Sequence, residues 1–237
     1  MRYRACTLGP LFALTIGCAA GCSASSEASD EDVTVEGEES SGSALSAADY
    51  PVPNLSADEK AAIVARYHVD PDGVVPKAML TDALAFVDAN KDKIHNKSYL
   101  TVVDFSKHSG EDRLFVVNLT SGAVQSHVVA HGSGSDPGNT GYATRFSNVN
   151  NSNESSLGYY LTGETYNGKH GGSLRLDGLS PTNSNARTRA VVMHGADYVS
   201  EGRSRQGRSW GCLALPQPDK DAVIAKLKGG SIFYAAH

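Results

Sequence analysis

Cysteine is scarce in this chain of 237 residues, and its four cysteines are unevenly placed. Three of them, Cys6, Cys18 and Cys22, lie in the first 22 residues, so Cys212 is the one thiol in the rest of the chain. This scarcity excludes a disulfide framework after residue 22 and a zinc site built from several thiolates. Cys212 is therefore either a small buried apolar residue or a reactive group.

An excess of basic side chains is also lacking. The formal net charge is −5, and seven acids with no Lys or Arg fall between residues 23 and 47. Residues 48–237 contain 19 basic and 19 acidic side chains, so we expect no nucleic-acid partner. The stretch at 23–47 has almost no large apolar side chain to bury, which predicts a disordered linker, either a membrane tether or a plain leader.

No apolar run is long enough to span a bilayer permanently. The run at 8–20 follows Arg2 and Arg4, which is typical of a secretory signal, so residues 1–22 are predicted to be a signal peptide. The sequences before Cys18 and Cys22 resemble a bacterial lipobox, and Cys22 is the favoured lipidation site. Neither has Leu or Val three residues earlier, so cleavage and release is the alternative. We expect export to the periplasm and an outer-membrane lipid anchor.

The rest of the chain predicts one mainly β domain with a few helices (α+β). Ser56 and Glu59 form a capping box before one short helix, and an apolar face at i, i+3, i+4 and i+7 predicts a second over Pro76–Lys91. These helices make residues 48–97 an N-terminal cover. From residue 98 to 237 the apolar period is two, as in strands, apart from a predicted helix over Asp219–Lys228. The predicted strands are Tyr99–Phe105, Arg113–Leu119, Ala123–Ala130, Leu157–Tyr166, Ser173–Leu176, Ala190–His194 and Ser231–Ala235.

The stretch from Ala190 to Pro216 has the residue types of a cysteine acyl-transfer site. A thiol attacks as its thiolate, and a neighbouring imidazole makes this possible near neutral pH, so His194 is the expected base for Cys212. Gly195 is expected to turn the chain sharply and to hold the other ring nitrogen through its carbonyl. Gly211 and Cys212 are expected to supply amides to an oxyanion.

The residues His194-Gly195 and Ser209-Trp210-Gly211-Cys212 resemble the signature of the L,D-transpeptidase catalytic domain, a YkuD-like family. Its usual form is His, a spacer of similar length, and Ser/Thr-His-Gly-Cys. The stretches S-L-G-Y-Y-L-T-G-E-T-Y-N-G-K-H-G, S-L-R-L-D-G-L and V-M-H-G-A-D-Y-V-S resemble the murein branch of this family, over roughly Tyr99 to Ala235. The chain departs from the pattern at Trp210, where the family has His, and at Leu213-Ala214.

This resemblance implies a β-sandwich-type catalytic domain that acts on peptidoglycan stem peptides. Cys212 would form an acyl-enzyme with release of D-alanine, His194 would act as base and acid, and an amine would accept the acyl group. Ser209 belongs to the same signature. One alternative is an L,D-carboxypeptidase or endopeptidase that hydrolyses the acyl-enzyme, and another is a non-catalytic cell-wall-binding lipoprotein.

Several further residues are candidates for the substrate groove, and no metal or cofactor is expected. The substrate-binding candidates are Trp210, Arg208, Tyr166, His131 and Arg145. His127 and His131 are four residues apart, which on a strand separates them by about 13 Å, too far for one ion. His108, His170 and His237 are expected to be solvated.

Overall fold

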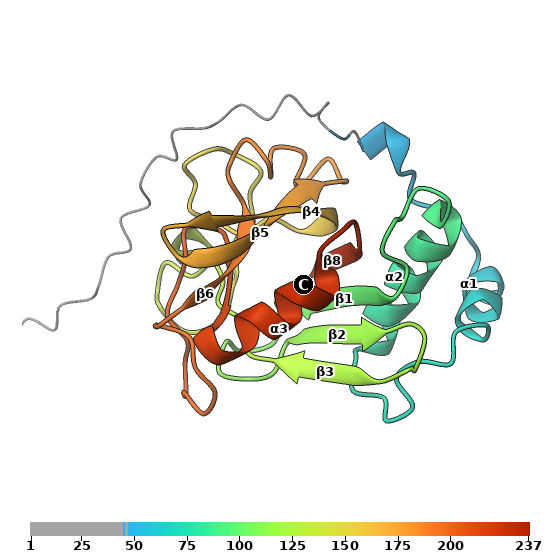
Figure 1. Ribbon diagram of the computed structural model, residues 1–237, viewed down its shortest axis with the longest axis horizontal. Coiled ribbons are helices and arrows are strands. Elements are labelled where there is room, and N and C mark those ends of the chain that lie inside the picture. The colour runs from blue at the N-terminus through green and yellow to red at the C-terminus, as the bar shows by residue number, and fades with distance from the viewer. Residues whose placement is uncertain (1–44, 46) are drawn as a thin grey trace, which may run out of the picture. The chain divides into compact units, whose positions relative to one another are not determined.

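The computed structural model describes residue 45 and residues 47–237 (Figure 1). The predicted signal peptide at 1–22, both candidate lipidation cysteines and almost all of the linker at 23–47 lie outside the described residues. Within the described part, no helix combines the length and the apolar character needed to cross a bilayer.

The described chain is mainly β with a few helices, as predicted. The α-helices are α1 (Ala57–Val64), α2 (Lys77–Asn90) and α3 (Gln217–Leu227). The strands are β1 (Tyr99–Asp104), β2 (Leu114–Asn118), β3 (Val124–His127), β4 (Gly158–Gly168), β5 (Gly171–Gly178), β6 (Val192–Ala196), β7 (Leu213–Pro216) and β8 (Ile232–Ala236). Two short 3-10 helices, Ala47–Asp49 and Ser133–Ser135, complete the elements.

The strands form a single sheet in the order β3-β2-β1-β8-β4-β5-β6-β7. The β1–β8 and β6–β7 pairs are parallel, and the other pairs are antiparallel. The chain that leaves β3 at one edge reaches β7 at the other edge, where the Ala130 N–H donates to the Ala214 carbonyl at 2.9 Å. A bridge between Gly132 and Ser209 extends this contact. The sheet therefore nearly closes on itself, as in a barrel.

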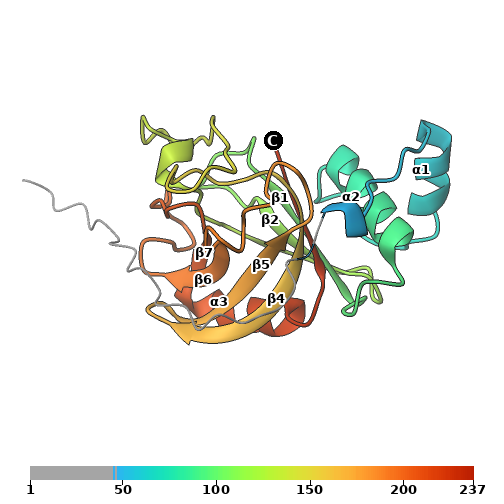
Figure 2. The ribbon, with the colours of Figure 1, turned by 90° about the horizontal axis from the view of Figure 1, so that it is seen from above.

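Strand alternation gives the sheet two apolar layers. One layer contains Val103 and Phe233 and packs against α3 through Val223 and Leu227. The neighbouring strand residues point the other way and pack against α2, which buries Leu84 and Phe86 among them. Figures 1 and 2 show α3 lying along the sheet, with α1 and α2 together on another side. Burial of both layers positions the strand ends that carry the candidate site.

Local signals explain the helix starts better than the short strands. The capping box is confirmed, because Ser56 Oγ accepts the Glu59 N–H at 3.3 Å and the Ser56 N–H donates to the Glu59 carboxylate at 2.8 Å. α3 begins two residues earlier than predicted, and a proline lies in its first turn. Proline is tolerated there because the N–H that it lacks would have no partner within the helix. The prediction missed β7, a strand of four residues.

Candidate active site

The adjacent strands β6 and β7 bring Cys212 and His194 into the same neighbourhood. Their parallel register pairs Met193 with Leu213 and His194 with Ala214. Met193 and Leu213 are buried in the α3-facing layer, so the register is anchored by core packing. Cys212 lies directly before Leu213 and two residues before Ala214, the register partner of His194. Residues 18 positions apart in sequence therefore meet through sheet pairing.

The loop that carries Cys212 is closed by the Ser209 side chain. Ser209 Oγ donates to the Cys212 carbonyl at 2.7 Å and accepts the Gly211 N–H at 3.1 Å. The Gly211 N–H is thus engaged here, and its expected role as an oxyanion donor stays a prediction that requires this bond to exchange. Gly211 has φ +117°, and a Cβ there would lie 2.8 Å from the Glu154 carbonyl oxygen. Glycine is required at this position on both counts.

The imidazole of His194 is buried and oriented by its own strand. Its Nδ1 lies 3.0 Å from the Gly195 carbonyl oxygen, so Nδ1 carries the proton and Nε2 is left as the basic nitrogen. The sharp turn expected at Gly195 does not occur, because β6 continues to Ala196. Instead, the missing side chain makes room for α3: a Cβ at Gly195 would lie 2.4 Å from Lys220 Cδ and 2.5 Å from Gln217 Oε1.

The thiol of Cys212 faces the chain segment that precedes β6. Its Sγ is 3.6 Å from the Ala190 carbonyl oxygen, and Ala190 has a positive φ of +52°. The neighbouring Arg189 guanidinium donates to the Ser147 carbonyl at 2.7 Å and to the Glu154 carbonyl at 2.6 Å. It thereby fixes the 147–156 loop beside the nucleophile.

Arg189 also interacts electrostatically with the thiol. Burial lowers the pKa of Arg189, whereas the negative charge of an ionised Cys212 works in the opposite direction. By the same interaction, the cation favours the thiolate over the thiol. Arg189 was not among the predicted site residues, and its position directly before the predicted strand Ala190–His194 was its only local signal.

Behind the Cys212 loop lies a buried group formed by Arg113, His131 and Asp136. The Arg113 Nη2 lies 2.8 Å from His131 Nδ1, so this nitrogen accepts and the ring is neutral. His131 Nε2 is 3.5 Å from Asp136 Oδ2. Burial, assisted by the charge of Arg113, lowers the pKa of His131 to about 4, and burial lowers the pKa of Arg113 to about 9.

This buried group supports the Cys212 loop through the backbone. The Ser209 N–H donates to the His131 carbonyl at 2.9 Å, and the Ser133 N–H donates to the Ser209 carbonyl at 2.7 Å. The His131 side chain is 1% exposed and cannot line a substrate groove as expected. It holds the backbone that positions the nucleophile instead.

The remaining groove candidates differ in where they lie. Trp210, next to the nucleophile loop, is 37% exposed, and Arg145 is exposed as well. Arg208 is half-buried and donates to the Asp136 carbonyl, so it ties its loop to the 3-10 segment at 133–135. Tyr166 packs under the Arg175 guanidinium and lines a cavity of about 270 Å³ against α3, whose lining does not include Cys212 or His194.

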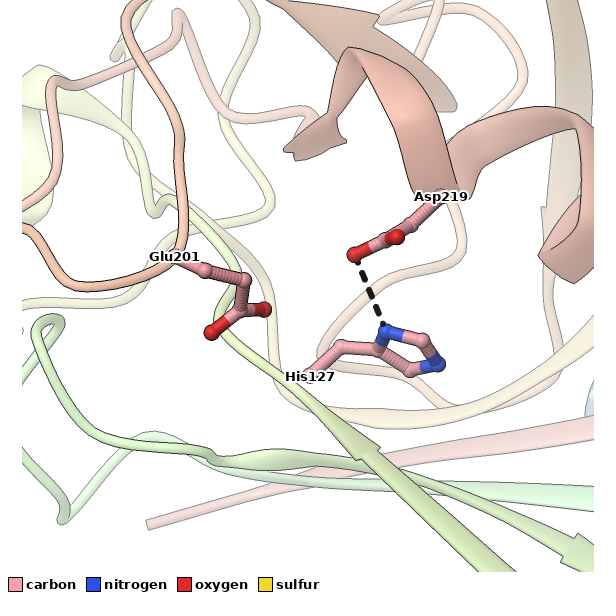
Figure 3. Close-up of side chains that lie close together, drawn as sticks. All are labelled: His127, Glu201 and Asp219. Carbon is pink, nitrogen blue, oxygen red and sulfur yellow. Dashed lines mark hydrogen bonds and ion pairs between the residues drawn. The ribbon is translucent and has the colours of Figure 1, made fainter.

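Among the described residues, one set has the composition of a metal site. His127, Glu201 and Asp219 each place one ligand atom within 4.8 Å of the others (Figure 3). His127 Nδ1 is 3.3 Å from Asp219 Oδ2, and the buried His127 Nε2 has no hydrogen-bond partner. A metal on Nδ1 would force the proton onto Nε2, where nothing accepts it. The His127–Asp219 contact joins the end of β3 to the first turn of α3.

Comparison with solved structures gives distant likenesses. They include the helical cell shape determining protein Pgp2 from Campylobacter jejuni (11% identity, 59% of this chain and 48% of that chain, TM-score 0.39). An L,D-transpeptidase from Mycobacterium tuberculosis H37Rv matches at 11% identity over 59% of this chain and 58% of that chain, with TM-score 0.39. An L,D-transpeptidase from Stackebrandtia nassauensis matches at 19% identity over 77% and 80%, with TM-score 0.36.

These structural likenesses carry no conclusion about chemistry. The chain covers 48% to 62% of the length of three of the matched structures. No curated protein matches the sequence. A family model described as L,D-transpeptidase catalytic domain matches residues 72–236, which takes in α2 and every strand of the sheet. Because this match covers most of the chain, the chain belongs to the L,D-transpeptidase catalytic domain family.

Proposed function

We propose that this protein is a cysteine acyl-transferase that acts on peptidoglycan stem peptides, with Cys212 as nucleophile and His194 as general base and acid. The observation that supports the proposal is the β6–β7 register, in which His194 pairs with Ala214, two residues after Cys212, while the Gly195 carbonyl accepts a hydrogen bond from His194 Nδ1. In that tautomer Nε2 is the nitrogen that takes the thiol proton.

The first half-reaction forms a thioester. The Cys212 thiolate attacks the carbonyl that joins an L-centre to the terminal D-alanine, and the carbonyl oxygen becomes an oxyanion. Collapse of this intermediate breaks the C–N bond, and His194 returns its proton to the leaving amine of D-alanine. The proposed oxyanion donors are the Cys212 amide and the Gly211 amide, the latter after it exchanges its bond to Ser209 Oγ, and one such donor contributes about 10²- to 10³-fold in rate.

The second half-reaction passes the acyl group to an amine. His194, neutral again, takes a proton from the incoming amine as it attacks the thioester, and the Cys212 thiol is released as an amide forms. Exposed Trp210 and Arg145 are the groove residues proposed to contact the peptide. The same thioester yields a carboxylic acid if water attacks it, so the acceptor decides between transfer and hydrolysis.

Product analysis tests the proposal. The purified protein and its Cys212→Ala variant are incubated with a disaccharide-tetrapeptide and followed by liquid chromatography and mass spectrometry. Cross-linked dimer with wild type alone supports transfer, and tripeptide without dimer identifies a hydrolase. The absence of both products with every stem peptide tried would favour a binding protein without catalysis.

We also propose that the protein acts in the periplasm, anchored through a lipid on Cys22 or Cys18. The signal layout of residues 1–22 supports this, as does the acidic linker that follows. Metabolic labelling with a palmitate analogue tests it: label lost in Cys22→Ser assigns Cys22, label lost in Cys18→Ser assigns Cys18, and no label in wild type excludes the anchor.

A further inference from the structure

A second histidine covers the ring of His194. The rings of His170 and His194 are stacked, with centroids 4.3 Å apart and planes inclined by 27°. This contact contradicts the expectation that His170 is solvated, and the residue is in fact half-buried. His194 itself is 2% exposed. A histidine from a distant hairpin is therefore part of the surroundings of the proposed base.

The hairpin geometry brings His170 to this place. β4 and β5 are joined by Lys169 and His170 alone, and the pair is closed by Gly168 opposite Gly171. Gly171 has φ +73°, and a Cβ there would lie 3.7 Å from Lys220 Nζ. The end of the hairpin is thus seated against α3, the helix that also packs on Gly195.

Stacking on His170 restricts a motion of the His194 ring that the hydrogen bond to the Gly195 carbonyl still allows. The hydrogen bond to the Gly195 carbonyl fixes one ring nitrogen, but the imidazole can still tilt about that bond. A ring stacked on the imidazole opposes this tilt. We propose that His170 is a positioning residue for His194, which holds the imidazole in the orientation that activates Cys212; this inference rests on the proposed function of that pair.

The charge state of His170 matters for this role. When His194 takes the thiol proton it becomes a cation, and a neutral ring stacked on it is tolerated, whereas a second cation opposes it. Lys169 lies beside His170 in the hairpin, and Lys220 of α3 lies near Gly171 and Gly195. Lys220 is paired with Asp221 at 2.8 Å, which offsets its charge.

The test is the rate of Cys212 alkylation by iodoacetamide between pH 5 and 9, followed by peptide mapping because the chain has three other cysteines. The variants are His170→Ala, His170→Phe and His194→Ala, with His237→Ala as the matched histidine control. Aromatic pairs of this kind stabilise by amounts equivalent to about 3- to 10-fold in a rate. We expect His170→Ala to slow alkylation at pH 7.5 by that factor and His237→Ala to leave it unchanged.

The phenylalanine variant separates positioning from simple structural support. Phe keeps a stacked ring, so His170→Phe should stay within about 2-fold of wild type at pH 7.5, whereas His170→Ala should not. Urea unfolding midpoints of all variants identify any loss of fold.

Each outcome decides between the two proposals. If His194→Ala slows alkylation and both His170 variants match wild type across the pH range, the role of His170 is refuted and the proposed function is untouched. If His194→Ala has no effect, the base assignment and the inference both fail. If alkylation behaves as expected but no peptide product forms, the proposed reaction fails while the role of His170 in activating the thiol stands.

Discussion

The buried His131 makes the protein sensitive to acid in a way that the structure quantifies. Its folded-state pKa is lowered to about 4, against about 6.5 in an unfolded chain. As pH falls through 6.5, the unfolded chain takes up this proton while the folded chain does not, so stability is complete above pH 6.5 and is lost towards pH 4. With about 1.4 kcal/mol for each pKa unit, the loss is about 2.5 kcal/mol at pH 4.5.

His131→Gln isolates this contribution from the other titrating groups. The glutamine oxygen can accept from Arg113 and its amide can donate towards Asp136, but the side chain takes no proton. Urea unfolding of both proteins at pH 7.5, 6.5, 5.5 and 4.5 gives the two stability profiles. The difference between them should change by about 2.5 kcal/mol over this range, in favour of the variant at low pH. Parallel profiles would refute the neutral, buried state of His131.

Two further substitutions test the surroundings of the nucleophile, and a third tests a buried polar contact beside β4. Arg189→Met should slow Cys212 alkylation at pH 7 by about tenfold, which corresponds to a rise of one unit in the pKa of the thiol. The matched control is Arg187→Met, which removes an ion pair with Asp177 and Glu164 and should leave that rate unchanged. Equal effects of the two substitutions would contradict the electrostatic role of Arg189. Gly211→Ala should lower the free energy of unfolding in urea by about 2 kcal/mol, because φ is positive there and the new Cβ would lie 2.8 Å from a carbonyl oxygen. The variant should also lose Cys212 alkylation. Wild-type values in both assays would disprove the loop geometry. Asn183→Ala should lower the free energy of unfolding by about 2 to 3 kcal/mol, because the buried amide donates to the Tyr159 carbonyl and accepts the Ser180 N–H, both at 2.8 Å. A loss below about 0.5 kcal/mol in urea unfolding would contradict this.

The sequence predicted the elements whose signals are local. The capping box at Ser56 and the two-residue period of β1 and β2 are patterns that neighbouring residues determine, and both are found in the structure. β7 was missed because its four residues lie between Gly211 and a proline-containing helix start, and only parallel pairing with β6 makes them a strand. Such pairing is not written in a local pattern.

The candidate site was predictable where it depends on residue type and not where it depends on burial. Residue type and resemblance point to Cys212 and His194, and in the structure His194 lies on β6 and Cys212 directly before the paired strand β7. His131 was assigned to the groove because a Gly- and Ser-rich loop follows it, yet Arg113, 18 residues earlier, holds it in the interior. Arg189 and His170 were missed because their partners come from distant segments.

The covalent intermediate is the most direct test of the central proposal. The purified protein is mixed with disaccharide-tetrapeptide, quenched in acid within seconds, and examined by intact mass and peptide mapping. The proposal predicts an adduct equal in mass to the substrate less D-alanine, located on Cys212 and absent in Cys212→Ala. An adduct that persists in that variant, or product formation with no adduct at any quench time, would contradict it.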